Sequence, residues 1–339
     1  MDDIVYENIT VQYCFPENNA SCRKEVRTGP AYIFLFIVLS CISVCTVFLN
    51  LLVIISISHF KQLHTPTNLI ILSLAVADLI VGLIVMPGNI MQLIDSCWYL
   101  GKLVCIFFPL ISSLSVFASV LSLVLIAVDR YIAVCDPLLY PSRVTVCKMS
   151  ICIILGWSFC VMYCVIYMYF NDHLITTQLY STCYGECLLL MKYSWLIFDF
   201  VLSFLIPFFV ILILYGLIFK VARRQAKSVR AVCNSVSKEQ EAKVPGSSET
   251  KAAKKLSLAI FVYLLCWIPF YLTSFSVETF STSSIVWTFF GWLLFFNSSI
   301  NPIIYAIFYQ WFRVSVKLIM TCRIYDPSSS RFNLFHDGV

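Results

Sequence analysis

Two carboxylates stand inside otherwise uncharged apolar segments, and they are the residues best placed to do chemistry. Asp78 lies in the segment 67–91 and Asp199 in the segment 194–219. A carboxylate at the centre of a membrane-spanning helix costs about 2.5–3.5 kcal/mol on insertion scales, so such a group usually faces a protein cavity and has a function. A buried carboxylate stays ionised only when it is paired. We therefore predict a cation-binding site at Asp199; a protonated Asp199, or one paired with Lys192, is the alternative.

Seven long apolar segments must position these carboxylates. The chain has 339 residues, of which 60% are hydrophobic and 12% charged, whereas a soluble protein is about 25% charged. A membrane helix needs about 20 apolar residues and satisfies its backbone polar groups within itself. The segments lack the alternation that marks a membrane strand. We expect an all-α membrane protein, a seven-transmembrane helix bundle with spans at 31–58, 67–91, 104–128, 149–170, 194–219, 256–276 and 285–308.

The distribution of lysine and arginine fixes the predicted orientation. With the N-terminus outside, five of the 23 basic residues fall on the outer side, which leaves 18 on the inner side, mostly in 220–255. Membrane proteins keep such an excess of basic residues in their cytoplasmic loops. The net charge of +5 then belongs to the inner membrane face and needs no nucleic acid as partner. The five outer residues are Arg23, Lys24, Arg27, Lys102 and Lys192.

The chain divides into an outer tail, a membrane domain and two inner segments. Residues 1–28 form the extracellular tail, and residues 29–310 contain the seven spans. Residues 311–324 alternate basic and apolar side chains, which predicts a short amphipathic eighth helix on the membrane surface. Residues 325–339 are predicted to be a disordered cytoplasmic tail. The Lys- and Ser-rich inner loop 223–252 is predicted to be flexible.

Six cysteines and two glycosylation sequons lie on the outer side. The sequons are at Asn8 and Asn19. Six cysteines in an oxidising compartment favour disulfides but allow 15 pairings, so spacing alone does not choose among them. Zinc at 183–187 is a weaker alternative, because no histidine pair lies nearby. On the inner side Cys322 is either a palmitoylation site or a free thiol. The outer cysteines are Cys14, Cys22, Cys97, Cys105, Cys183 and Cys187.

Short motifs mark places where the helices could move. Asp129-Arg130-Tyr131 ends the third segment at the inner face, where the acid can hold the arginine or release it to a partner. Asn301-Pro302-Ile303-Ile304-Tyr305 and Cys266-Trp267-Ile268-Pro269 place kinking prolines in the seventh and sixth segments. With one marker on each remaining segment, the set resembles the rhodopsin-like G-protein-coupled receptors over residues 31–324. Those markers are Asn50, Asp78, Trp157 and Pro207.

A more specific resemblance lies at the seventh segment. Residues 297–312 are similar to the fingerprint of the trace amine-associated receptors, and 221–227, 290–292 and the outer cysteine pattern fit the same family. The resemblance implies a multi-pass plasma-membrane receptor that binds small trace or odorant amines and activates a heterotrimeric G protein. It suggests olfactory use and a stimulatory G protein. It also implies the disulfides Cys105–Cys183, Cys14–Cys187 and Cys22–Cys97.

The chain departs from this family where the ligand ammonium is usually held. The family has an aspartate on the third segment, 18 residues before Arg130, and a tyrosine on the seventh, but this chain has Ser112 and Phe295 there. Asp199 resembles the acid that a subset of fish olfactory members carries on the fifth helix. The implied ligand pairs its ammonium with Asp199, and nearby aromatic side chains either contact it or only pack as core. The candidates are Trp267, Phe270, Tyr271, Trp292 and Phe295.

Asp78 has a different interpretation. The resemblance implies that it holds a sodium ion with four other polar side chains. A buried acid–amide network without an ion is the alternative. In either case the cluster is a bistable element that a ligand could bias. The other four residues are Ser119, Asn297, Ser298 and Asn301.

We expect no enzymatic activity, because the chain has no Gly-rich phosphate loop, no His-Glu-x-x-His and no Gly-x-Ser-x-Gly. Two other functions stay open. One is a receptor of the same fold for a neutral or peptide ligand, with Asp199 structural. The other is a transporter, which the lack of repeats disfavours. One acid favours a monoamine, whereas Asp95 or Glu278 near the outer rim could hold a second ammonium.

Overall fold

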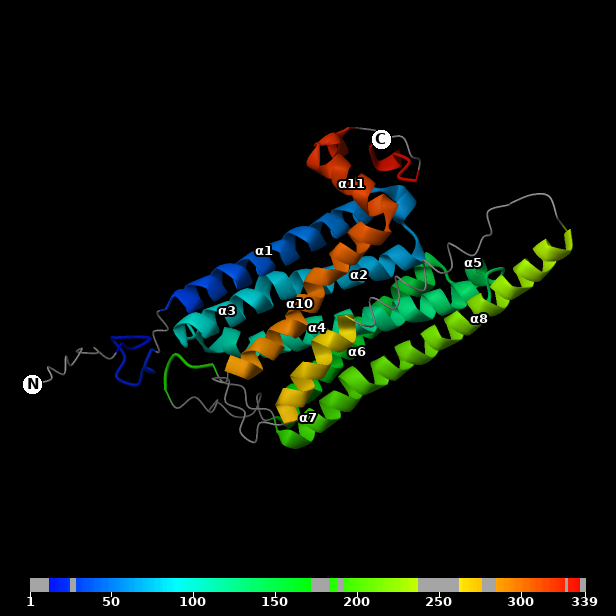
Figure 1. Ribbon diagram of the computed structural model, residues 1–339. Helices are drawn as coiled ribbons and strands as arrows, with labels where there is room; N and C mark the ends of the chain where they lie inside the picture. The colour runs from blue at the N-terminus through cyan, green and yellow to red at the C-terminus, as the bar shows by residue number, and fades with distance from the viewer. Residues whose placement is uncertain are drawn as a thin grey trace, which may run out of the picture.

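The computed structural model describes residues 12–24, 29–171, 183–187, 192–236, 262–275, 285–326 and 329–335. In this part of the chain six helices are long and apolar enough to cross a membrane, and a shorter apolar helix covers Val262–Phe275. These seven helices correspond to the seven predicted spans. They run side by side in one bundle, and α11 (Gln310–Met320) follows the last of them (Figure 1).

Of the six long spans, four are single helices, and the second and fifth are each built from three consecutive elements. The single helices are α1 (Pro30–His59), α4 (Gly101–Cys135), α6 (Val146–Phe170) and α10 (Ile285–Phe308). The second span consists of α2 (Pro66–Ile80), η2 (Val81–Val85) and α3 (Met86–Asp95), and the fifth of α7 (Tyr193–Asp199), η3 (Phe200–Leu205) and α8 (Ile206–Val236). A short inner helix, α5 (Tyr140–Arg143), lies between α4 and α6.

Each composite span has a wider, π-type turn just before a proline. The turn η2 precedes Pro87, and η3 precedes Pro207. Proline supplies no amide hydrogen and crowds the carbonyl four residues earlier, so the helix must be remodelled at that point. Such turns are frequent at functional sites. In the fifth span the wide turn begins directly after Asp199.

Three buried clusters hold the bundle together at different depths. At the inner end, side chains of α1, α2 and α11 pack around Phe60, Leu63 and Phe312. At the outer end, Trp98, Phe108 and Trp292 join α3, α4 and α10. Between these two ends, a middle cluster joins α4, η3 and the helix Val262–Phe275. Its buried members include Val120, Phe204, Tyr263, Trp267 and Tyr271.

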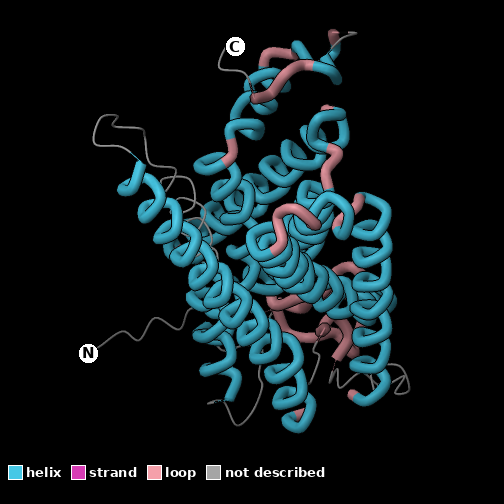
Figure 2. Tube along the Cα trace, turned by 90° about the vertical axis from the view of Figure 1, so that its right-hand side faces the viewer, coloured by secondary structure: helices cyan, strands magenta, loops and turns pink. Residues whose placement is uncertain are grey.

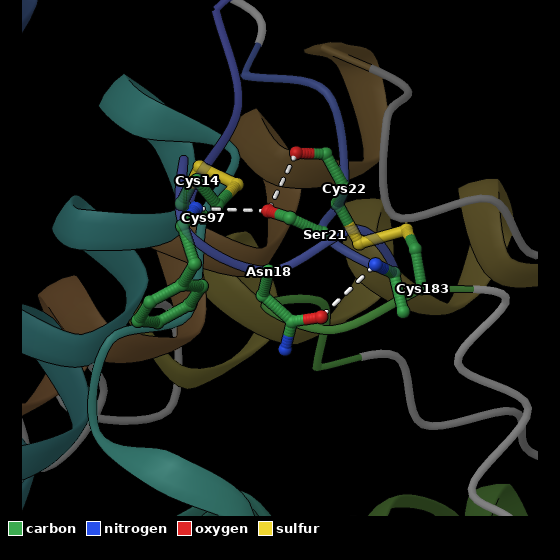
Figure 3. The surroundings of a disulfide bond; sticks show 8 residues. Cys14, Asn18, Ser21, Cys22, Cys97 and Cys183 are labelled. Atoms are coloured by element: carbon green, nitrogen blue, oxygen red, sulfur yellow. Dashed lines mark hydrogen bonds between the residues drawn. A yellow bond between two sulfur atoms is a disulfide. The ribbon is translucent and has the colours of Figure 1, made fainter.

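All six outer cysteines form disulfides, but the three predicted pairings are wrong. The structure joins Cys14 to Cys97, Cys22 to Cys183, and Cys105 to Cys187. Figure 3 shows the first two, on either side of Ser21. Because Cys183 and Cys187 are both oxidised, neither offers the thiolate that the zinc alternative requires.

The path of the outer tail explains why the disulfide pairing differs from the predicted one. Residues 12–24 turn back on themselves, with Cys14 N donating to Cys22 O at 3.0 Å, and lie along the outer loop, where Tyr184 N donates to Ala20 O at 2.6 Å. This alignment brings Cys22 to Cys183. Gly185, with φ of +102°, then turns the loop so that Cys187 reaches Cys105 on α4. The glycosylation candidate Asn19 is exposed on this tail, whereas Asn8 lies outside the described residues.

The inner ends are more ordered than the sequence indicated. Helix α8 continues through Val236, so the first part of the predicted flexible loop is helical. Residues 329–335 pack against the inner cluster, where Leu334 is fully buried. The ring of His59 lies 2.9 Å from Ser329 Oγ. The prediction of disorder after residue 325 was therefore wrong for this segment, because Leu334 has an apolar cluster on which to pack. Figure 2 shows these C-terminal turns at one edge of the bundle. The thiol of Cys322, just before them, is exposed.

Candidate functional site

Asp199 lies at the outer part of the fifth span, and its carboxylate is held by hydroxyl groups from two other spans. The Tyr163 hydroxyl on α6 donates to Asp199 Oδ1 at 2.8 Å. The Tyr271 hydroxyl, on the helix Val262–Phe275, donates to Oδ2 at 2.8 Å. Among the described residues, the hydrogen-bond partners of this carboxylate are all neutral hydroxyls. Lys192, the alternative partner, donates its ammonium to Phe170 O at 2.8 Å.

Ser203 completes the hydroxyl cluster from one turn further along the same span. Its Oγ lies 2.5 Å from the main-chain oxygen of Asp199 and 3.3 Å from Oδ2. It also lies 2.5 Å from the Tyr271 hydroxyl. We call Asp199, Tyr163, Ser203 and Tyr271 the Asp199 cluster. It links the fourth, fifth and sixth spans through one carboxylate.

Aromatic rings surround the Asp199 cluster on both sides. On the α6 side the Tyr163 ring is 4.4 Å from Phe117 and 6.2 Å from Phe198, between ring centroids. On the other side the Tyr271 ring is 4.9 Å from Phe200 and 6.0 Å from Trp267. The Asp199 carboxylate therefore lies in a surrounding made largely of aromatic rings, which pack against one another. Aromatic faces attract cations through their quadrupoles.

The structure divides the predicted aromatic contacts between two clusters. Trp267, Phe270 and Tyr271 belong to the middle cluster with the partners of Asp199. Trp292 and Phe295 pack against each other in the outer cluster, with ring centroids 5.7 Å apart. Ser112 is partly buried on α4, and its carbonyl accepts from Ser115 Oγ at 2.9 Å.

Sequence reasoning missed Tyr163 and Ser203. Ser203 follows Asp199 by four residues, so helical spacing could have found it. Tyr163 carried no such signal, because the fourth span is rich in aromatic residues and only its packing shows which of them meets Asp199. The indole nitrogen of Trp267 is buried and without a hydrogen-bond partner among the described residues.

At the inner face the predicted Asp129–Arg130 pair is formed and has two further partners. Arg130 Nη2 lies 2.5 Å from Asp129 Oδ2. Thr67 Oγ1 donates to Asp129 Oδ2 at 2.8 Å and Tyr140 to Oδ1 at 2.7 Å. Thr67 also accepts from Arg130. Burial raises the pKa of the Tyr140 phenol, and its bond to Asp129 acts in the same direction. Tyr131 is partly buried beside this group.

Asp78 is fully buried and hydrogen-bonded to Ser119 and Asn301, which are among the four polar side chains expected around it. Ser119 Oγ donates to Asp78 Oδ1 at 3.1 Å, and Asn301 Nδ2 donates to Oδ2 at 2.7 Å. Asn297 and Ser298 are also buried on α10, about one turn before Pro302 and about two turns before Tyr305. Carboxylate, hydroxyl and amide oxygens are ligands that suit a hard cation, so the residues present fit sodium.

Comparisons with known proteins identify the family to which the chain is related. Residues 49–305 match the family described as 7 transmembrane receptor (rhodopsin family). Trace amine-associated receptor 13c of Danio rerio is 40% identical over 329 residues, 96% of each chain. Trace amine-associated receptor 6 of Homo sapiens is 39% identical over 339 residues, 98% of each chain. Trace amine-associated receptor 9 of Mus musculus is 39% identical over 334 residues, 96% of each chain.

The comparisons and the bundle together settle the class of protein. The matched region includes five whole spans, parts of the first and seventh, and the motifs at Arg130, Pro269 and Tyr305. The protein is a multi-pass plasma-membrane receptor with its N-terminus outside, and it is not an enzyme. The chain belongs to the rhodopsin family of seven-transmembrane receptors and, within it, to the trace amine-associated receptors.

Proposed function

We propose that this receptor binds small amines through an ion pair between the ligand ammonium and Asp199. The observation that carries the proposal is the Asp199 carboxylate inside the bundle, surrounded by neutral hydroxyls. Hydroxyls satisfy its hydrogen bonds, but within the described part of the chain none of these partners supplies a positive charge. Each carboxylate oxygen accepts two hydrogen bonds, so Oδ1, with one described donor, retains an acceptor position. An ammonium supplies both the missing charge and a donor.

The relatives support the chemical class of the ligand. They are trace amine-associated receptors, which points to an amine. The third and seventh spans of this chain carry Ser112 and Phe295 where that family resemblance places an acid and a tyrosine. Of the two acids within the predicted apolar segments, Asp78 is enclosed by Ser119 and Asn301. Asp199 is the acid left to meet a ligand from the outer side.

The Asp199 cluster offers a physical path from the ligand to the sixth span. An ammonium paired with the Asp199 carboxylate draws on its negative charge and so weakens the hydrogen bond that Oδ2 accepts from Tyr271. A change at Tyr271 reaches Trp267, four residues earlier on the same helix and stacked against it. Pro269 lies between them and is the point at which that helix can bend. Bending there separates the inner ends of the helices and makes Arg130 accessible to a heterotrimeric G protein, for which we propose the stimulatory class.

Replacing Asp199 by asparagine tests the proposal. We expect Asp199→Asn to reach the cell surface, since asparagine can still accept from one tyrosine and donate to another. Loss of a buried charge pair costs about 2–5 kcal/mol, so amine EC50 values should rise at least about 30-fold. The measurement is cyclic AMP in cells given a panel of primary, tertiary and diamines. Glu17→Gln, an exposed acid of the outer tail, is the matched control.

The outcomes separate the two candidate functions. An unchanged amine response in Asp199→Asn at equal surface expression would show that Asp199 is structural. A response to amines only through another second messenger would reject the stimulatory G protein and keep the ion pair. Asp95→Asn tests whether Asp95 binds the second ammonium of a diamine. Loss of the diamine response alone would assign the second ammonium to that residue.

A further inference from the structure

The carbonyl of Ser203 lies in the π-type turn η3, just before Pro207, and accepts a hydrogen bond from the sixth span. In an α-helix this oxygen accepts from the amide four residues later, but that residue is Pro207, which has no amide hydrogen. The Tyr263 hydroxyl donates to the Ser203 carbonyl at 3.3 Å. Tyr263 and Ser203 are each 2% exposed. The contact is thus a buried bond between a side chain of one span and the backbone of another.

Ser203 is held by the sixth span at two levels. Its carbonyl accepts from Tyr263, and its hydroxyl bonds the hydroxyl of Tyr271 at 2.5 Å. Tyr263, Trp267 and Tyr271 are spaced by four residues, so they share one face of the helix. Their rings follow one another at 5.3 Å and 6.0 Å, and Phe204 packs against all three.

The two bonds lie on opposite sides of the proline kink. Tyr263 precedes Pro269 by six residues, on the inner side, and Tyr271 follows it by two, on the outer side. If the inner half of the helix swings about Pro269, the Tyr263 hydroxyl must leave the Ser203 carbonyl while Tyr271 can stay. Arg130 is paired with Asp129 in this structure, so the arginine is held, as the proposed activation requires of the state before the helix swings.

We propose that the Tyr263 hydroxyl, bonded to the Ser203 carbonyl, is a latch that restrains the resting receptor and sets how easily it is activated. The proposal rests on the bending of the sixth span described above, and it does not require that Asp199 bind an amine. A phenylalanine at this position would fill the same space, so the restraint comes from the Tyr263 hydroxyl alone. When the helix swings, the carbonyl and the phenol both lose a buried partner.

Tyr263→Phe removes the latch and keeps the ring. We expect basal signalling per receptor at the surface to rise roughly two- to twelvefold, the range that corresponds to one hydrogen bond. EC50 values for all amines should fall together, with the order of ligands unchanged, because the variant shifts the resting equilibrium and leaves the ligand contacts intact. Tyr169→Phe is the matched control, since that tyrosine is exposed on the outside of α6.

Two further arms keep the test decisive. In an Asp199→Asn background the basal rise should persist, which separates the latch from the amine site. In a Pro207→Ala background, which restores an amide hydrogen at that position, Tyr263→Phe should change basal signalling less than in the wild type. If Tyr263→Phe is retained inside the cell, nucleotide exchange on the G protein is measured with purified, lipid-reconstituted receptor. Unchanged or reduced basal signalling, or an equal effect with and without Pro207, would overturn the proposal.

Discussion

The hydroxyl of Tyr140 should keep the receptor at rest, although it lies outside the predicted activation motif. It donates at 2.7 Å to Asp129 Oδ1, while Arg130 and Thr67 bond the other oxygen. The Asp129 side chain is completely buried in its pair with Arg130. Tyr140→Phe therefore leaves one oxygen of a buried carboxylate without its described partner. The carboxylate then holds the arginine in a less fixed position.

The size of the effect follows from this geometry. A hydrogen bond to a charged group contributes about 1.5–3 kcal/mol, and the partly exposed site of Tyr140 favours the lower end of that range. A change of about 1.5 kcal/mol is roughly a tenfold shift between resting and active states. Burial raises the pKa of Tyr140 above the value of about 10 that a tyrosine has in an unfolded chain. The hydrogen bond of the neutral phenol to Asp129 therefore stabilises the structure fully at any pH below about 10, and this stabilisation is lost only as the pH rises further. The effect should not vary with pH in the physiological range.

The assay measures ligand-independent signalling per receptor at the cell surface. It is run at two pH values that the cells tolerate, about one unit apart and both between about 6.5 and 8. Tyr325→Phe is the control, because that tyrosine is 85% exposed on the inner side. A basal signal equal to that of the control would refute the reasoning. So would a large difference between the two pH values, since neither lies near the titration of this phenol.

Three other predictions concern distant parts of the molecule. Replacing external and internal sodium by a large organic cation should raise the apparent affinity for agonists in the wild type. Asp78→Asn should abolish this dependence on sodium. A sodium effect that survives the substitution would show that no sodium ion binds at Asp78. Cys22→Ser should cost about 2–5 kcal/mol of stability and lower surface expression, and Cys183→Ser should give the same loss alone or combined with it; additive losses would contradict the Cys22–Cys183 pairing. Leu334→Asp should release residues 329–335 to proteolysis, because a charge cannot stay in the inner apolar cluster; a cleavage rate equal to the wild type would show that the segment is not held there.

The spans and the orientation follow from the sequence because they depend on local properties. A run of about 20 apolar residues spans a bilayer wherever it occurs, and the basic residues near its ends choose its direction. The lone charge at Asp199 and the proline motifs were visible for the same reason. Helical spacing also links Asp199 to Ser203 on one face, so part of the site could be derived without a fold.

The partners of these residues could not be derived in that way, because they depend on how each helix is rotated and packed against its neighbours. Tyr163 reaches Asp199 from the fourth span, and Tyr140 reaches Asp129 from a short inner helix. The path of the outer tail decided among 15 cysteine pairings and corrected all three predicted pairs. The amino-acid sequence thus determined which residues enter the membrane and carry charge there. Only the tertiary structure determined which hydroxyls, rings and sulfurs meet them, since those contacts join residues far apart in the chain.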